Sequence, residues 1–227
     1  MLLYLILLFI ATPTLFLIAN EVAKKCPKIT RKLLHSGLFL IGAVIYVYYG
    51  VQLVTLYGLY LFPFSPFLTS DKTSIGKAIL RGERQRETFI GLGLTVSASF
   101  INATLFPQYF LYGVLIAAIG DTCGDLVGST VGKIKYNVPL TDLAIKFLQI
   151  HAPKIYKIIN PTEKKHSRSV EGSVALMISS ALTLLPLVPP EEAITCAFAA
   201  ALLEAISPRN TDNFILQITP SIVMPFF

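Results

Sequence analysis

Two aspartates, Asp121 and Asp125, lie four residues apart near the end of a long apolar segment of this 227-residue chain. At that spacing both carboxylates project from one face of a helix, where they can share a single cation. Charge is costly to place inside a membrane, and acidic side chains found there usually serve a function. The pair therefore predicts a site for magnesium or another divalent cation.

Glycines repeat with the same four-residue spacing around these aspartates, at Gly120, Gly124, Gly128 and Gly132. They form a helix face without side chains, which another helix or a phosphate-bearing ligand can approach closely. Packing between helices is the more usual reason for such a row of glycines. Packing does not, however, explain either aspartate.

A basic cluster begins an earlier apolar segment, where Arg31, Lys32 and His35 stand close together. Arg31 and His35 are four residues apart and can point to one spot at the membrane surface. Basic residues before a membrane helix usually serve only to orient it, but orientation does not require His35. Arg81 and Glu83 belong to a charged loop of the kind that is usually solvated.

A later apolar segment opens with Ser169 and Glu171, just after Lys165 and Arg168. Helix capping by Ser169 and the helix dipole at Glu171 account for these two residues. They do not account for Arg168 or Gly172, and a helix N-terminus beside cations is a natural phosphate site. A last polar group stands at the end of a span, where acids are unexpected: Glu204, Ser207, Asp212 and Asn213.

The elements that must position these residues are membrane helices. The chain is 54% hydrophobic and only 14% charged, with a mean hydropathy of +0.66. This composition excludes an ordinary soluble domain and predicts an all-α, polytopic integral membrane protein that forms one domain over residues 1–227. We expect seven to eight transmembrane helices, at about 1–18, 33–49, 51–68, 88–106, 108–128, 170–187, 192–206 and, more weakly, 214–227.

The distribution of cations predicts the orientation of these helices. All 19 lysines and arginines lie in four segments between the expected spans, and the turns near Gly50, Pro107 and Pro189 carry none. The positive-inside rule then places the basic loops and the candidate site in the cytoplasm and the N-terminus outside. Residues 133–168 form the longest basic loop, in which 141–159 predicts one or two interfacial amphipathic helices, with a solvated linker as the alternative.

The sequence indicates neither nucleic acid binding nor a structural role for its cysteines in disulfides or a metal site. The net charge of +6 comes without a basic patch interleaved with aromatic residues, so we expect no nucleic acid partner. Cys26, Cys123 and Cys196 are widely separated and indicate neither a disulfide framework nor a metal knuckle. The sequence favours no particular oligomeric state.

Carboxylates, cations and helix ends at one membrane face are the groups that phosphoryl or nucleotidyl transfer requires. A divalent cation would bridge phosphates, and Lys and Arg would neutralise the charge that develops on them. The second substrate would be a lipid from the bilayer. The same chemistry serves a kinase and a cytidylyltransferase.

The chain resembles the CTP-dependent polyprenol, dolichol, phytol and diacylglycerol kinases, which are relatives of the phosphatidate cytidylyltransferases. Five motifs carry this resemblance, in order: Arg31-Lys32-Leu-Leu-His35, Arg81-Gly-Glu83, Gly120-Asp121 through Asp125 and Gly128 to Gly132-Lys133, Arg168-Ser169-Val-Glu171-Gly172-Ser173, and Glu204-Ala-Ile-Ser207 with Asp212-Asn213. The family more often has Lys at the position of Arg168. The loop at 133–168 is also longer than the family leads us to expect.

The resemblance implies an enzyme that transfers the γ-phosphate of CTP to a lipid alcohol, with a divalent metal, at the cytoplasmic surface. It assigns Asp121 and Asp125 to the metal and the nucleotide phosphates, and it assigns a nucleotide-binding strip to Lys133, Arg168, Ser169 and Glu171. The residues from Arg31 to His35 correspond to the first motif of the family, and Glu204, Asp212 and Asn213 to its last. His35, Asp125 or Glu171 is expected to accept the proton of the lipid hydroxyl.

Two alternatives to a kinase remain at this stage. A cytidylyltransferase that makes a CDP-activated lipid needs the same residues but reacts at the α-phosphate. An ion-coupled transporter would use Asp121 and Asp125 as ion ligands. Against the transporter, the polar groups collect at one interface, and the chain shows no inverted repeat.

Overall fold

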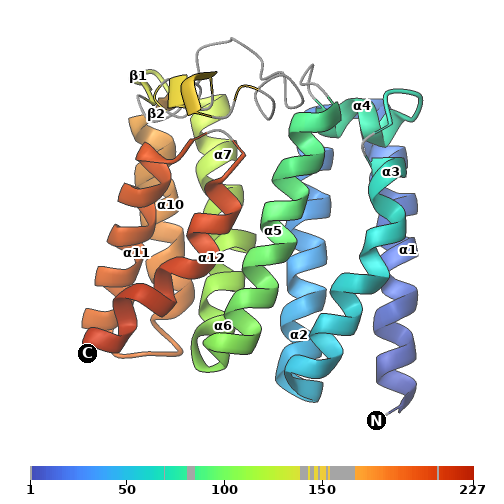
Figure 1. Ribbon diagram of the computed structural model, residues 1–227, viewed down its shortest axis with the longest axis horizontal. Coiled ribbons are helices and arrows are strands. Elements are labelled where there is room, and N and C mark those ends of the chain that lie inside the picture. Colours follow the sequence, from blue (N-terminus) through green and yellow to red (C-terminus); the bar gives the residue numbers. More distant parts are fainter. Residues whose placement is uncertain are drawn as a thin grey trace.

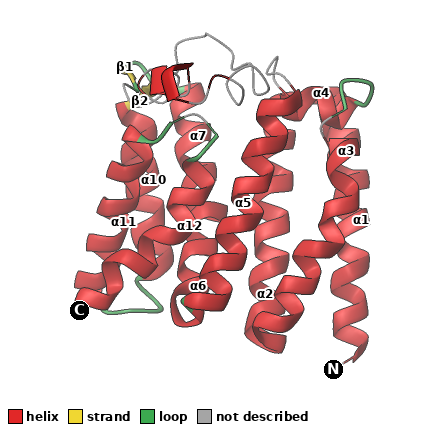
Figure 2. Cartoon of the chain, in the orientation of Figure 1, coloured by secondary structure: helices red, strands yellow, loops and turns green. Residues whose placement is uncertain are grey.

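The computed structural model describes residues 2–68, 70–80, 85–138, 143, 146–147, 149–151, 153, 167–208 and 210–227. Most of these residues are helical, and the helices stand side by side in one bundle (Figures 1 and 2). The main helices are α1 (Leu2–Lys25), α2 (Pro27–Leu61), α3 (Ser65–Leu68), α4 (Ser74–Leu80), α5 (Gln85–Leu105), α6 (Pro107–Leu115), η2 (Ile116–Gly120), α7 (Asp121–Thr130), α10 (Val170–Leu184), α11 (Pro190–Ile206) and α12 (Asp212–Val223).

Three of these segments are long and apolar enough to cross a membrane: Ile29–Leu61, Thr88–Leu105 and Pro107–Thr130. A fourth apolar helix, Val170–Leu184, is shorter. Large apolar side chains such as Tyr48, Leu105 and Leu182 are exposed on the outside of the bundle, as expected for a surface that faces lipid. These features agree with the prediction of an all-α membrane protein.

The chain reverses direction at Gly50, as the uncharged turn in the sequence predicts. Gly50 has φ 79° and ψ −174°, a conformation that is open to glycine and strained for other residues. It divides α2 into two parts, and Figure 1 shows the chain turning back at the lower end of the bundle. This turn returns the chain to the end at which α4 begins.

The segment that carries the aspartates is the most enclosed of the three. Half of the 18-residue apolar stretch in Pro107–Thr130 is buried inside the protein, against 22% of the corresponding stretch in Ile29–Leu61 and 17% in Thr88–Leu105. Its neighbour α10 lies along it, and α11 and α12 complete this side of the bundle (Figure 1). Apolar residues from these helices form one core cluster, which includes Ile116, Leu176, Leu184, Cys196 and Leu216.

Two short strands were not predicted by the sequence. β1 (Lys135–Asn137) and β2 (Ser167–Ser169) pair in antiparallel register, with Lys135 opposite Ser169 and Tyr136 opposite Arg168. They lie beyond the end of α7 and the beginning of α10 (Figure 1). Most of the expected amphipathic segment at 141–159 lies outside the described residues.

A buried polar network holds α12 against α5. The Nδ2 group of Asn102 donates to the Gln217 carbonyl at 2.7 Å, and the Gln217 side chain binds Ser99 at 2.5 Å and the Asn213 carbonyl at 3.1 Å. Asn102 and Gln217 are both fully buried. Because buried polar groups need partners, this network fixes α12 and with it the polar residues at its start.

Candidate functional site

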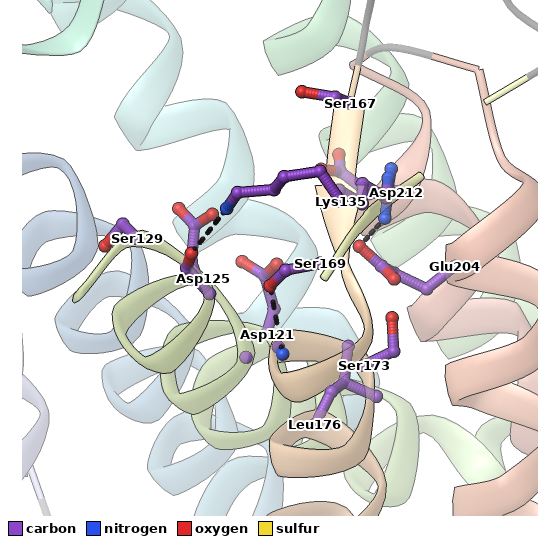
Figure 3. Close-up of a pocket in the computed structure, with 14 residues that line it drawn as sticks. Asp121, Asp125, Ser129, Lys135, Ser167, Ser169, Ser173, Leu176, Glu204 and Asp212 are labelled. Carbon is purple, nitrogen blue, oxygen red and sulfur yellow. Dashed lines mark hydrogen bonds and ion pairs between the residues drawn. The ribbon is translucent and has the colours of Figure 1, made fainter. Parts of the chain in front are cut away.

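A cavity of about 220 Å³ lies between the end of α7, the two strands and the polar ends of α10, α11 and α12 (Figure 3). Its walls bring together residues that are far apart in the sequence. The lining residues are Asp121, Gly124, Asp125, Gly128, Ser129, Lys135, Ser167, Arg168, Ser169, Gly172, Ser173, Leu176, Glu204 and Asp212.

Asp121 and Asp125 converge on one cation position, as their spacing predicts. The ammonium group of Lys32 lies 2.6 Å from Oδ2 of Asp121 and 2.9 Å from Oδ2 of Asp125. The Asp121 side chain is 9% exposed, whereas that of Asp125 is 43% exposed and borders the cavity. The pair therefore has one buried and one accessible carboxylate.

This pair fits a magnesium ion that shares its coordination with a phosphate substrate. Magnesium commonly takes one or two protein carboxylates and completes its shell with waters and substrate phosphates. Both carboxylates already reach a single positive group, and their oxygen atoms are the ligands that magnesium prefers. Among the described residues, no group of three or more His, Cys, Asp or Glu side chains could hold a metal by itself.

A π-helical turn, η2, precedes Asp121 and fastens α7 to α2. Nε2 of His35 donates to the Ala117 carbonyl at 3.0 Å, and Oγ of Ser36 donates to the Ala118 carbonyl at 2.8 Å. Ser36 also binds Oγ1 of Thr122 at 2.6 Å. Because π-helical turns disturb the regular helical hydrogen bonds, their carbonyls can serve such side chains. These bonds fix the distance between Lys32 and Asp121.

His35 lies beside the carboxylate pair, and it is not among the described residues that line the cavity. Its Nε2 is 3.5 Å from Oδ2 of Asp121, and its ring meets Phe39 edge-on at 4.7 Å between centroids. A carbonyl oxygen can only accept a hydrogen bond, so Nε2 carries the proton in its bond to Ala117.

Arg168 ties β2 to the end of α11. It forms an ion pair with Glu204, and its Nη2 donates to Oγ of Ser207 at 3.0 Å. Burial alone would raise the pKa of nearby Asp212, but the positive charges of Arg168, Arg31 and Lys32 hold that pKa below its ordinary value. Charged groups from four parts of the chain therefore act on one another here.

The start of α10 is capped as the sequence predicts. Oγ of Ser169 accepts a hydrogen bond from the backbone of Gly172 at 3.1 Å. Glu171 points to the other side, where its carboxylate accepts the backbone N–H groups of Lys133 at 2.9 Å and Ile134 at 3.1 Å. Glu171 thus anchors the chain that leads from α7 into β1.

The glycine face of α7 packs against α10. A Cβ atom on Gly124 would lie 3.0 Å from the Gly172 carbonyl oxygen, and one on Gly128 would lie 2.9 Å from Oγ of Ser169. Side chains on Gly120 and Gly132 would overlap Ser180 and Ser169. Of the two uses expected for this face, close helix packing is the one seen, while Gly124 and Gly128 also border the cavity.

Lys135 lines the cavity, although the sequence did not single it out as a site residue. Lys135 extends from β1 toward the α7 aspartates (Figure 3), and its ammonium group donates to the Gly128 carbonyl at 2.9 Å. Ser173 binds the hydroxyl group of Tyr136 at 2.7 Å. Only the pairing of β1 with β2 brings Lys135 and Tyr136 to the site, and three-residue strands leave little signal in a sequence.

Most of the predicted site residues gather in this region. Asn213 donates its backbone N–H to Asp212 at 3.0 Å, and the charge of Arg31 acts on the same carboxylate. The Lys133 side chain is exposed, and it is not among the described residues that line the cavity. Lys165, Arg81 and Glu83 lie outside the described residues.

No protein-family model matches the chain, and no curated protein or solved structure matches it either. The resemblance to the CTP-dependent lipid kinases therefore stays a prediction.

Proposed function

We propose that this protein is a CTP-dependent lipid kinase, which transfers the γ-phosphate of CTP to a membrane lipid alcohol. One observation carries the proposal. The paired carboxylates of α7, the cations Lys135 and Arg168, and the capped start of α10 surround a single cavity at one end of an apolar bundle. A phosphate donor needs such cations, and a lipid acceptor needs the apolar bundle beside them.

Asp121 and Asp125 would hold the magnesium ion, and the ion would supply charge neutralisation between the phosphates. Lys135, which extends toward these carboxylates (Figure 3), and Arg168 also line the cavity and would attract the phosphates. The buried ion pair with Glu204 keeps Arg168 in place. The protein's main contribution is therefore to position charge, as in other phosphoryl transfers.

Asp125 is the best placed of the three candidates to accept the proton of the lipid hydroxyl. Its side chain borders the cavity and is 43% exposed. By contrast, Nε2 of His35 donates to a backbone carbonyl, and Glu171 binds the backbone at residues 133 and 134. A hydroxyl group inside the cavity can therefore reach Asp125.

The proposal includes the orientation expected from the charges, with the site in the cytoplasm and the N-terminus outside, and it takes the larger of the two expected numbers of spans, seven or eight. The two chain ends lie at the same end of the bundle, opposite the strands (Figure 1), whose residues Lys135 and Ser167–Ser169 line the cavity. This arrangement supports an even number of crossings. The lysines and arginines of the described loops, such as Lys72, Lys133 and Lys135, belong to the end with the cavity.

The test supplies purified protein in lipid nanodiscs with magnesium and with CTP labelled at either the α- or the γ-phosphate. Dolichol, geranylgeraniol, phytol and diacylglycerol are offered in parallel as acceptors. We expect the γ-label, and not the α-label, to enter one of these lipids with release of CDP. The Asp121→Asn variant serves as the inactive control, because the glycine contacts of α7 with α10 remain in it.

Two results would contradict the proposal. Transfer of the α-label with release of pyrophosphate would identify a cytidylyltransferase. No transfer of either label to any of the four alcohols would exclude a kinase for these lipids, and uptake of a solute into vesicles that depends on an ion gradient and on Asp121 would then indicate a transporter.

A further inference from the structure

Lys32 occupies the point at which the two carboxylates of the site meet. Its ammonium group lies 2.6 Å from Asp121 and 2.9 Å from Asp125, and its side chain is only 8% exposed. Lys32 and Asp121 are both almost fully buried, each with 6% of its surface exposed. A buried lysine with two carboxylate partners acts as their counter-ion.

Lys32 is shared by two carboxylates of different exposure. The Asp121 side chain is 9% exposed, whereas that of Asp125 is 43% exposed and borders the cavity, so a cation from solution can approach the pair from the Asp125 side. A divalent cation would neutralise both carboxylates. It could not share the position with the ammonium group, because two positive charges at such short range repel each other strongly.

The helix that carries Lys32 is held in place close to the site. His35 and Ser36, one turn further along α2, are fastened to the carbonyls of Ala117 and Ala118. The four-carbon stem of a lysine can swing its ammonium group over several ångströms by rotation alone. Asp125 borders the cavity. If the Lys32 ammonium group leaves Asp121 and Asp125, it can therefore form ion pairs with the phosphates of a nucleotide bound there.

We propose that Lys32 is a built-in counter-ion, which holds Asp121 and Asp125 together before substrate binds and gives up this position to the divalent cation. The proposal deepens the kinase function proposed above and rests on it for the identity of the nucleotide. The displaced ammonium group then pairs with the phosphates, so the metal and the nucleotide favour each other's binding. A divalent cation without nucleotide competes with Lys32 and binds weakly.

Without the charge of Lys32, a divalent cation no longer competes for the carboxylate pair, and the folded protein needs the cation to neutralise the two aspartates. In Lys32→Met, the side chain keeps its length and loses its charge, so Asp121 and Asp125 have lost their shared counter-ion. A divalent cation then becomes the group that stabilises the folded protein. Lys32→Arg retains a positive charge and keeps the weak response to metal of the original protein.

The experiment measures the thermal unfolding midpoint in detergent against the concentration of Mn²⁺, without nucleotide. We expect the midpoint of Lys32→Met to rise at Mn²⁺ concentrations on the order of tenfold lower than those that affect the unsubstituted protein. Lys24→Gln is the matched control, because it removes an exposed ion pair with Glu21 at 2.6 Å on α1, a different helix from the one that carries Lys32. Adding Asp121→Asn to Lys32→Met should abolish the response to Mn²⁺.

Equal responses of Lys32→Met and the unsubstituted protein would overturn the proposal, as would the absence of any response in Lys32→Met. Failure to recover folded Lys32→Met even in millimolar Mn²⁺ would also overturn it, since the ion has to replace the missing charge. No phosphoryl transfer enters this measurement. A response of Lys32→Met to Mn²⁺ without transfer of labelled phosphate would support the counter-ion role of Lys32 and contradict the kinase function. Transfer of labelled phosphate without this response to Mn²⁺ would support the kinase function and contradict the counter-ion role.

Discussion

Arg168 at the β2 strand and Glu204 near the end of α11 form an ion pair whose side chains are only 9% and 13% exposed. The pair connects the strand beside α10 to the far wall of the cavity. It also brings the arginine charge close to Asp212, where it lowers the pKa of the carboxyl group. Two acids from different helices thus depend on one guanidinium group.

Glu204→Gln should destabilise the protein, because it leaves the Arg168 charge buried with weaker partners. We expect the free energy of unfolding to fall by about 3 kcal/mol, the lower end of the range for a broken buried pair, since Asp212 lies nearby. Chemical unfolding in mixed micelles measures this change. Lys24→Gln, which breaks an exposed pair with Glu21, should cost less than about 1 kcal/mol. Equal losses in the two variants would contradict the importance of burial.

Gly113→Ala should weaken the contact of α6 with α12. A Cβ atom at this position would overlap the backbone oxygen of Gln217 and lie 3.0 Å from Nδ2 of Asn102. We expect a loss of roughly 1–3 kcal/mol in the free energy of unfolding, as for other overpacked sites.

Gly93→Ala is the matched control for Gly113, because Gly93 is also helical and has nothing within 4 Å of its would-be Cβ atom. Alanine should be neutral there or stabilise the helix by up to about 1 kcal/mol. Unfolding midpoints of the two variants in the same detergent give the comparison. A Gly113→Ala protein as stable as Gly93→Ala would mean that the two helices do not approach as closely as described.

The response to acid should involve Asp212. Its pKa is lowered from the ordinary value of 3.8 in the folded protein, so its ionised form stabilises the fold at pH values above 3.8. That contribution is lost as the pH falls through the lower folded pKa. The unfolding midpoint of Asp212→Asn should therefore depend less on pH in the acidic range than that of the unsubstituted protein. Parallel curves for the two proteins would rule out this contribution.

The local features of the site were predictable because they depend on residues close together in the sequence. The four-residue spacing of Asp121 and Asp125 gives their shared cation position, the Ser169 cap follows from residue type, and Gly50 marks a turn without charges. Helix periodicity and capping act over one or two turns, which a single sequence displays directly.

Long-range partners were not predictable in this way. Lys32 is 89 residues from Asp121, and Asn102 is 115 residues from Gln217. Nothing in the sequence near Lys32 distinguishes a counter-ion for two aspartates from a lysine that merely orients a membrane helix. Such contacts follow from how α2, α5 and α12 pack in three dimensions, and η2 shifts the register of that packing just before Asp121.

The structure and the family resemblance point to different lysines, Lys135 and Lys133, as the one that binds the nucleotide. The resemblance assigns Lys133 to nucleotide binding, whereas the structure places the Lys135 side chain at the cavity wall and uses the Lys133 backbone to bind Glu171. If the cavity binds the phosphates of CTP, Lys135→Gln should raise the KM for CTP roughly tenfold, equivalent to about 1.4 kcal/mol for one lost contact between a cation and a phosphate.

Lys133→Gln should change that KM by a smaller factor, and neither substitution should alter the KM for the lipid alcohol. Initial rates at varied CTP, with saturating lipid and then the reverse, measure both constants for each variant. The two lysines carry the same charge two residues apart, so general electrostatic attraction would affect both equally. A larger effect of Lys133→Gln would show that the nucleotide lies outside the cavity, on the exposed side of the loop that follows α7.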